Sequence, residues 1–535
     1  MGLDDRFRTG YAKVMWRTML EPGEISDGSK PLGGQWFAAT LTSVYVVLEL
    51  INIRHHAMWA DEMQVWSFAE HSHSLRELHH LTRYEGHPEA WSFLVYFISR
   101  FSSNPVAMQF LHLAIAVATV YVIARYSPFS HLEKVLIVFG YFFFFEYATI
   151  SRDYALGIFG LFSFCAVFRP GPDKPYIRLG LLLALMSGSN IYALILALSL
   201  ALMILFEALL RHDPRHDLLP RARGIICAAA VFFAATCVSL AHMRPPADIG
   251  WSVVSDLTVR AYTGWSSSLA MIWKAFVPIP QLSRQFWNTN FLGDHFRVMA
   301  VLSIFLLGMS VLFFIGKKTS LFLWAFGLAA SLLFKKLVYT GLLRHDGHVF
   351  MLFLACVWLS KSYPEQKSPL RMVETIAQRF RPYQDRIFLG LLAGQVIAAL
   401  IASAIAFKVP FSQAKATADF LRSKHMDRMF IVGDPDFAVS SIAGYLGRDI
   451  YYPEGDRMGS YVIWDRRRTF PTAPALELAR TKAAERHQDV VLLLNAPDPA
   501  AREIASFTGA VVRFENYYLY LVPPEKQKEI SSSGR

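Results

Sequence analysis

The feature that most constrains this chain is a series of long apolar blocks separated by short basic loops. Blocks such as 179–210, 298–315 and 387–407 are each long enough to cross about 30 Å of hydrocarbon as an α-helix. Only 18% of the residues are charged, against about 25% in an average soluble protein. One very large soluble core would not divide its apolar residues into separate blocks. The pattern therefore predicts a polytopic α-helical membrane protein.

We predict about eleven spans between residues 36 and 407, which form a transmembrane domain behind a tail over residues 1–35. The spans fall near 36–53, 105–125, 133–150, 154–168, 178–188, 190–210, 224–243, 298–316, 319–338, 347–360 and 387–407. The apolar run 88–101 is short for a crossing and carries Glu89 and Arg100. We interpret that run as a helix at the membrane interface.

The distribution of positive charge predicts which side each loop faces. The net charge is +11, and the basic residues cluster in short loops between apolar blocks, which the positive-inside rule assigns to the cytoplasm. This explains the charge without a nucleic-acid partner. It places the tail in the cytoplasm and two larger loops, 54–104 and 244–297, outside it. We expect the chain to lie in the inner (plasma) membrane of a bacterium.

The composition changes after about residue 408, where short β-rich runs alternate with helical patterns. The β-rich runs are 429–433, 461–464, 490–495, 510–514 and 517–522. A helical pattern at 473–486 lies between two of them. The alternation predicts a small α/β domain over residues 408–535. Because the predicted number of crossings is odd, this domain is expected on the extracytoplasmic side.

Titratable residues are densest in the first outer loop. Asp61 and Glu62 closely follow the first span, and Glu85 and His87 precede the interfacial helix. An acidic pair beside a membrane span is costly unless it is partnered or used, and a carboxylate there can act as a general base. The alternative is an ordinary solvated loop. We favour a functional site because the acidic residues are clustered beside tryptophans such as Trp59.

Two further groups place cations near carboxylates at predicted outer boundaries. Arg152 beside Asp153 is suited to clamping a phosphate or a sugar, although a snorkelling Arg that anchors the helix end is an equal alternative. The third group consists of Lys335, Lys336, Tyr339, Arg344, His345 and His348. Its cations lie at a predicted outer boundary, whereas the other basic residues cluster in loops that are predicted to face the cytoplasm. A bound anion such as a lipid phosphate explains them better than interface anchoring.

The sequence gives little support for a metal or nucleotide site. The first outer loop holds His71, His73, His79, His80 and His87. Together with Glu85 they offer metal ligands, but their spacing matches no zinc signature. We therefore predict no metal site and no required cofactor, and a divalent metal remains an alternative without support from spacing. The chain also lacks a phosphate-binding glycine loop, a dinucleotide fingerprint and a nucleophile elbow.

Taken together, these motifs resemble the GT-C superfamily of membrane glycosyltransferases. Asp61-Glu62, soon after the first span, resembles the signature acidic motif of that superfamily. Glu85-Gly86-His87-Pro88 resembles the branch that includes protein O-mannosyltransferases and the lipid A aminoarabinose transferase, and Ser151-Arg152-Asp153 resembles the second acidic motif of that branch. The resemblance in motifs covers the first third of the chain, and the remainder is similar in architecture.

The resemblance implies an inverting transfer of a sugar from a polyprenyl-phosphate donor to an extracytoplasmic glycolipid, polysaccharide or protein. Asp61 would be the general base, Glu62 would support it, and Asp153 would help bind the acceptor or orient the site. The donor phosphate would be held by Arg152, Lys335, Lys336, Arg344 and His348. The other expected substrate-binding residues are Glu85, His87, Tyr339 and His345. The assignment of the third group is our own inference from its position.

The main alternative is a transporter or flippase of envelope lipids or glycans. Transporters usually show related halves and charged residues near the middle of the membrane, whereas this chain shows no repeat and its notable charges lie at the predicted outer boundary. A second alternative is a non-catalytic scaffold of the envelope. A scaffold would not need Asp61, Asp153 and Arg344 to converge on one cavity.

Overall fold

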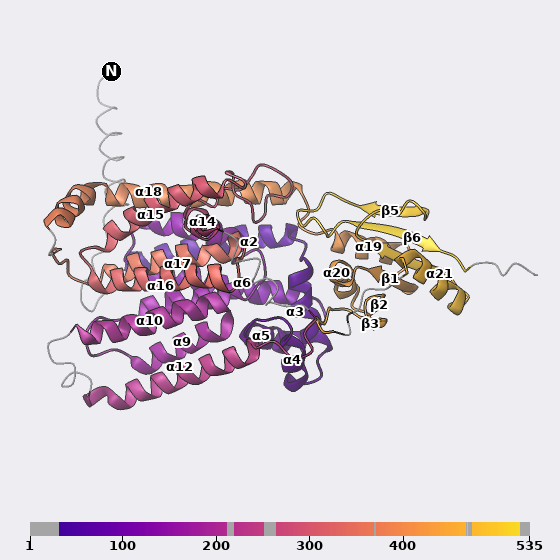
Figure 1. Cartoon of the computed structure of the whole chain (residues 1–535), viewed down its shortest axis with the longest axis horizontal. Coiled ribbons are helices and arrows are strands. Elements are labelled where there is room, and N and C mark those ends of the chain that lie inside the picture. The colour runs from indigo at the N-terminus through magenta and orange to yellow at the C-terminus, as the bar shows by residue number, and fades with distance from the viewer. Residues whose placement is uncertain are drawn as a thin grey trace, which may run out of the picture.

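The computed structural model describes residues 32–210, 219–250, 264–368, 371–466, 468 and 473–524. Figure 1 shows a bundle of long helices, with a small sheet domain at one end of the molecule. The predicted tail over residues 1–35 lies outside the described residues except for 32–35. Residues 251–263 of the predicted second loop and 525–535 of the predicted α/β domain also lie outside them.

Among the described residues, seven helices are long and apolar enough to cross a membrane by length and composition. They are α2 (Leu32–His55), α6 (Val106–Tyr126), α10 (Ile191–Leu209), α12 (Ala222–Met243), α15 (Phe296–Phe314), α16 (Lys318–Leu337) and α18 (Arg371–Lys408). Each corresponds to a predicted span, and the prediction of a polytopic helical protein is confirmed. The total number of spans stays a prediction, because several other predicted spans are shorter helices.

Two of these shorter helices, α8 (Tyr154–Val167) and α9 (Tyr176–Ser189), lie at predicted spans. α9 and α10 are separated by Asn190, whose backbone is extended and whose side-chain oxygen accepts a hydrogen bond from Ala193 N at 2.9 Å. This bond satisfies one of the free N–H groups at the start of α10. The predicted spans 178–188 and 190–210 are therefore two separate helices that meet at Asn190.

Helix α17 (Leu343–Ser360) runs through the interior of the bundle. Every one of its residues is buried, so no lipid contacts its surface. A helix enclosed by protein is free to carry ionisable groups that hydrocarbon would exclude. This position explains how α17 holds Arg344, His345, Asp346 and His348.

The span predicted near 133–150 is not one regular α-helix. α7 (His131–Val138) is short, and a π-helical turn, η1 (Phe142–Glu146), follows it. Tyr147 N donates to the carbonyl of Phe142 at 2.9 Å, which is the i→i+5 bond of a π-turn. All four phenylalanines of η1 are buried. Irregular backbone at membrane depth is tolerated where protein encloses it, and aromatic packing provides that enclosure here.

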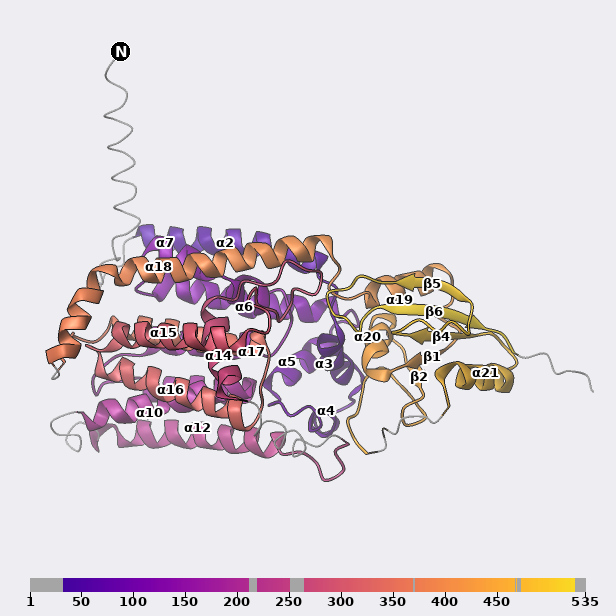
Figure 2. The same ribbon diagram turned by 45° about the horizontal axis from the view of Figure 1, so that its top comes forward.

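The helices α3 (Ala60–His71), α4 (Leu75–Thr82) and α5 (Ala90–Ser99) lie between the bundle and the sheet domain (Figure 2). With 10 residues, α5 is about 15 Å long and too short to cross, in agreement with the interfacial helix that we predict. The predicted second loop contains α14 (Trp265–Phe276), which packs against α15 and α17.

The C-terminal domain is a six-stranded sheet with the order β3-β2-β1-β4-β6-β5. Its strands are β1 (Phe430–Asp434), β2 (Ile450–Tyr452), β3 (Arg457–Gly459), β4 (Val490–Leu494), β5 (Glu503–Phe507) and β6 (Tyr517–Val522). β1 pairs in parallel with β2 and β4, and the other pairs are antiparallel. Helices α19 (Ala414–Ser423) and α20 (Asp436–Leu446) cover one face and α21 (Ala475–Arg486) covers the other.

Two of the predicted strands are wrong, because side chains or loops replace their strand partners. In the run 461–464, Val462 N donates to Gln64 Oε1 at 3.0 Å, and Gln64 Nε2 donates to Val462 O at 2.7 Å. In the run 510–514, Val511 N and Val512 N donate to the carbonyls of Pro410 and Phe411. The first run therefore attaches the sheet domain to α3, and the second packs on the segment that joins α18 to α19.

Candidate active site

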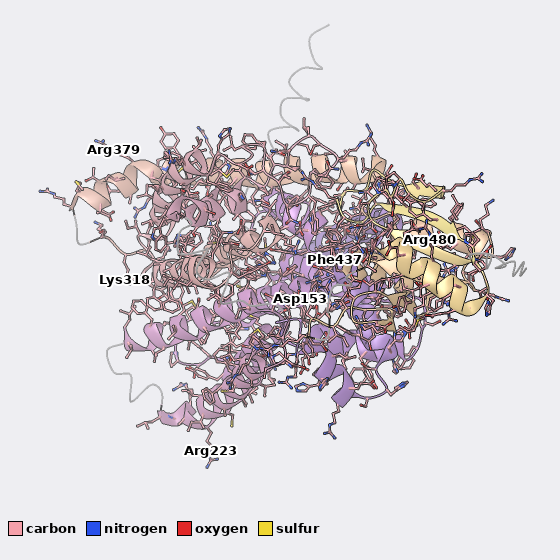
Figure 3. The ribbon with its side chains drawn as sticks, turned by 45° about the vertical axis from the view of Figure 1, so that its right-hand side comes forward. Asp153, Arg223, Lys318, Arg379, Phe437 and Arg480 are labelled. Carbon is pink, nitrogen blue, oxygen red and sulfur yellow. The ribbon has the colours of Figure 1, made fainter. Side chains whose placement is uncertain are left out.

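Three predicted residues from three distant parts of the chain meet at the junction between the bundle and the sheet domain. The Asp61 carboxylate lies 3.4 Å from Arg152 Nη1 and 3.7 Å from Arg344 Nη2. Arg152 also donates to the backbone carbonyl of Asp61 at 2.9 Å. Figure 3 shows the neighbouring Asp153 between the bundle and the sheet domain. We call Asp61, Arg152 and Arg344 the carboxylate–guanidinium cluster.

The first turn of α3 fixes the position of Asp61. Ala60 N donates to Glu515 Oε1 at 2.5 Å, so a carboxyl oxygen from the sheet domain caps the start of this helix. Asp61 itself is about one-third exposed, at 35% of its side-chain surface. It is therefore accessible to a substrate while its backbone is held from both sides.

Glu62 takes a different position from Asp61 and is fully buried. Its Oε2 accepts hydrogen bonds from His56 Nε2 at 2.7 Å and Trp59 N at 3.2 Å, and its Oε1 accepts from Ser151 N at 2.7 Å. Glu62 thus ties the segment before α8 to the start of α3. The geometry gives it the role of positioning the backbone beside Asp61 and Arg152.

Arg344 is held by two tryptophans. Its guanidinium lies 4.9 Å from the ring centroid of Trp287 and 5.5 Å from that of Trp59. The Tyr147 hydroxyl donates to the Arg344 carbonyl at 2.7 Å. Cation–π contacts of this kind orient a planar guanidinium. Trp287 could not be singled out from the sequence, because nothing in the predicted second loop distinguishes it from the other aromatic residues there.

The buried Asp153 lies beside this cluster, 3.8 Å from His87 Nδ1. Neither of its oxygens has a hydrogen-bond partner among the residues that the structure describes. A buried carboxylate without such a partner is costly, so a ligand hydroxyl would stabilise it. A narrow pocket reaches this point, and its lining includes Glu85, His87, Arg152 and Asp153.

Burial sets the protonation of the groups around this pocket. It raises the pKa of Glu85 to about 7, although a hydrogen bond from Gln64 opposes the shift. Burial lowers the pKa of His87, so the neutral imidazole is favoured. Burial also disfavours the charged form of Arg152, but Asp61 and its neighbours outweigh this effect and raise the Arg152 pKa. The guanidinium therefore stays charged at every physiological pH.

The third predicted group is only partly gathered at this site. Lys335 forms a buried ion pair with Asp346, and the Lys336 ammonium lies 5.8 Å from the ring centroid of Trp265. Asp346 is a counter-ion inside the protein, so the presence of Lys335 at this end of α16 does not require a bound anion. Of the cations in this group, Arg344 is the one that contacts Asp61.

The remaining members of the third group pack as rings. His345 and His348 both stack on Tyr192 with ring centroids 5.1 Å apart. Tyr339 lies edge-on to His345 at 5.4 Å. These contacts surround the start of α17 with aromatic rings and thereby support the backbone that presents Arg344.

The arrangement of this bundle, junction and sheet domain is the fold of a solved membrane-protein structure, ArnT. The chain is similar to ArnT from Cupriavidus metallidurans in the apo state, with a TM-score of 0.50, 10% sequence identity, and coverage of 91% of this chain and 99% of that one. At this identity the similarity establishes the fold. The architecture that the motifs predict is thereby confirmed.

Two further solved structures are similar over most of this chain. ArnT from the same organism bound to undecaprenyl phosphate gives a TM-score of 0.48 at 11% identity, covering 91% of this chain and 99% of that one. The arabinofuranosyltransferase AftD from Mycobacteria gives a TM-score of 0.34 at 11% identity, covering 93% of this chain and 42% of that one. No protein-family model and no curated protein sequence matches the chain.

Proposed function

We propose that this chain is an inverting glycosyltransferase that moves a sugar from a polyprenyl-phosphate donor to a hydroxyl group of an extracytoplasmic acceptor. The observation that carries the proposal is the Asp61 carboxylate held between Arg152 and Arg344. A base and two cations at one point are the groups that such a reaction requires. The GT-C fold supports this class of chemistry.

The proposed reaction is a single displacement. The acceptor oxygen attacks C1 of the sugar and Asp61 takes the proton of that hydroxyl. The bond between C1 and the phosphate oxygen breaks, and its electron pair leaves with the polyprenyl phosphate. Arg152 and Arg344 stabilise the charge that develops on the phosphate. Because attack and departure occur on opposite faces of C1, the configuration at C1 is inverted.

The geometry also suggests how donor binding prepares the base. In the structure both guanidiniums contact Asp61. A phosphate that binds the same guanidiniums would compete with Asp61 for them and free the carboxylate to face the acceptor. Asp153 and His87 would then contact the acceptor, because Asp153 is a buried carboxylate in the adjoining pocket.

The distribution of basic residues supports an extracytoplasmic site. Figure 3 shows Arg223, Lys318 and Arg379 at the end of the bundle remote from Asp153. By the positive-inside rule this remote end faces the cytoplasm. The proposal therefore includes an inner-membrane location, a cytoplasmic N-terminus and a sheet domain outside the cytoplasm.

The test is transfer of radiolabelled sugar from a panel of polyprenyl-phosphate sugars to acceptors in membranes that contain the chain. Asp61→Asn keeps the shape and the hydrogen-bond acceptor but removes the base, so transfer should fall about a hundredfold or more. Asp173→Asn is the control, because Asp173 is an exposed carboxylate, with 84% of its side chain accessible. It should transfer like the wild type.

Thermal unfolding would check that Asp61→Asn is folded. Equal transfer by the wild type and Asp61→Asn would remove Asp61 from the mechanism. Absence of transfer from every donor in the panel, with membrane acceptors present, would count against a polyprenyl-phosphate donor.

A further inference from the structure

A second polar cluster lies outside the carboxylate–guanidinium cluster, where α4, α5 and α12 meet. It consists of His79 in α4, Glu89 at the start of α5 and His242 in the last turn of α12. His79 Nδ1 lies 2.6 Å and His242 Nδ1 lies 3.1 Å from the same Glu89 oxygen. One ligand atom from each residue lies within 4.8 Å of the others. We call these residues the His–Glu–His cluster.

The hydrogen bonds within the His–Glu–His cluster do not satisfy every buried polar atom of its side chains. The side chains of His242 and Glu89 are 1% and 8% exposed. Neither ring nitrogen of His242 makes a hydrogen bond of normal geometry with a described residue. An imidazole buried in this way is costly. A cation between the three side chains would bind His242 and neutralise the buried carboxylate.

We propose that the His–Glu–His cluster binds one zinc ion. Two imidazoles and one carboxylate are a donor set that Zn²⁺ prefers. Ligand atoms about 2.1 Å from a tetrahedral zinc lie about 3.4 Å from one another. The two distances to Glu89, 2.6 Å from His79 and 3.1 Å from His242, are shorter, so zinc would replace the His79–Glu89 hydrogen bond and move these two side chains apart. His79 is half exposed, at 49%, so the ion has a path from solvent and a fourth position for water.

The zinc ion would hold the backbone of a segment that lines the neighbouring pocket. Residues 79–89 run from the last turn of α4 to the start of α5, and Glu85 and His87 of this segment line the pocket beside Asp153. A zinc ion would fasten both ends of the segment to α12. The ligands contact none of Asp61, Arg152 and Arg344 in the described hydrogen bonds and ion pairs, so the inference is independent of the proposed function. Spacing in the sequence did not reveal it, because His242 is far from the other two ligands in the chain.

The test measures zinc bound to the purified full-length chain, carried on a tag without histidine. The protein is treated with a chelator, incubated with Zn²⁺ alone, freed of excess metal and analysed by elemental mass spectrometry. We expect about one zinc per chain for the wild type, and background levels for His79→Ala and His242→Ala. His80→Ala is the matched control, because His80 is an exposed neighbour that packs on Tyr84 instead.

A spectroscopic measurement keeps the test independent of folding defects. Co²⁺ in the same site should give the visible absorption bands of a four-coordinate ion with nitrogen and oxygen ligands. These bands should disappear in His79→Ala, whose exposed side chain can be removed with little effect on thermal unfolding. A wild type that retains no zinc would overturn the proposal and leave a hydrogen-bonded cluster. Zinc retained equally by His79→Ala, His242→Ala and His80→Ala would also overturn it.

Discussion

At the scale of single residues, the site depends on carboxylates that are held by partners from distant parts of the chain. Asp61 contacts two guanidiniums, Glu62 binds the backbone of Ser151, and Glu515 caps the helix that carries both. The acidic pair and the cations are visible in the sequence because their residue types are unusual beside membrane spans. Glu515 is not recognisable in the sequence, because a single acidic residue in the sheet domain has no local pattern that marks it.

Glu515 provides a prediction about pH. Burial raises its pKa to about 8, whereas the ordinary value is about 4.3. As the pH rises from about 4.5 to 8, the unfolded chain releases this proton and the folded chain retains it, so the free energy of unfolding falls with pH. Glu515→Gln removes this dependence. The free energy of unfolding of the variant, relative to that of the wild type, should therefore rise by about 2 kcal/mol between pH 5 and pH 8.

Thermal unfolding at several pH values measures this difference. Glu503→Gln changes an exposed carboxylate in the same domain and should follow the wild type at each pH. If Glu515→Gln and the wild type lose stability in parallel between pH 5 and pH 8, Glu515 is not the buried acid described above.

At the scale of elements, regular segments were predictable from sequence and irregular ones were not. The long helices, β1, β4, β6 and α21 lie where periodicity and β-rich runs predict them. The π-turn at η1 follows from packing of its aromatic residues inside the bundle, and the run 461–464 follows from bonding to Gln64. Both depend on contacts between distant residues, which local patterns do not encode.

The approach of α17 to η1 provides a prediction at this scale. A Cβ added at Gly347 would lie closer than van der Waals contact to Phe142 and Tyr147. Gly347→Ala should therefore displace α17 and lower the free energy of unfolding by about 1–3 kcal/mol. It should also reduce sugar transfer, because Arg344 lies one turn earlier in the same helix and would move with it. Gly308→Ala in α15 meets nothing within 4 Å and should change neither quantity.

Thermal unfolding and the transfer assay measure both variants side by side. Identical behaviour of Gly347→Ala and Gly308→Ala would show that close packing of α17 on η1 does not position the site.

At the scale of the whole molecule, the junction explains why a membrane bundle carries a sheet domain. The domain contributes Glu515 to the start of α3, and Val462 in its connection exchanges two hydrogen bonds with Gln64. These contacts fix α3, which carries Asp61 and Gln64, and Gln64 in turn donates a hydrogen bond to Glu85 in the turn before α5. The general architecture was predictable from the order of apolar blocks and β-rich runs. The exact contacts across the junction were not, because they join residues hundreds of positions apart.

Sugar transfer by this chain, as opposed to movement of lipid across the bilayer, can be measured in liposomes. The liposomes contain the purified chain, membrane-derived acceptor lipids and a polyprenyl-phosphate donor labelled in its sugar. Covalent attachment of label to acceptor and crossing of the intact donor are followed separately. We predict attachment with equal release of polyprenyl phosphate, abolished by Asp61→Asn, and crossing no faster than in protein-free liposomes. Faster crossing without attachment would contradict the account and identify a flippase.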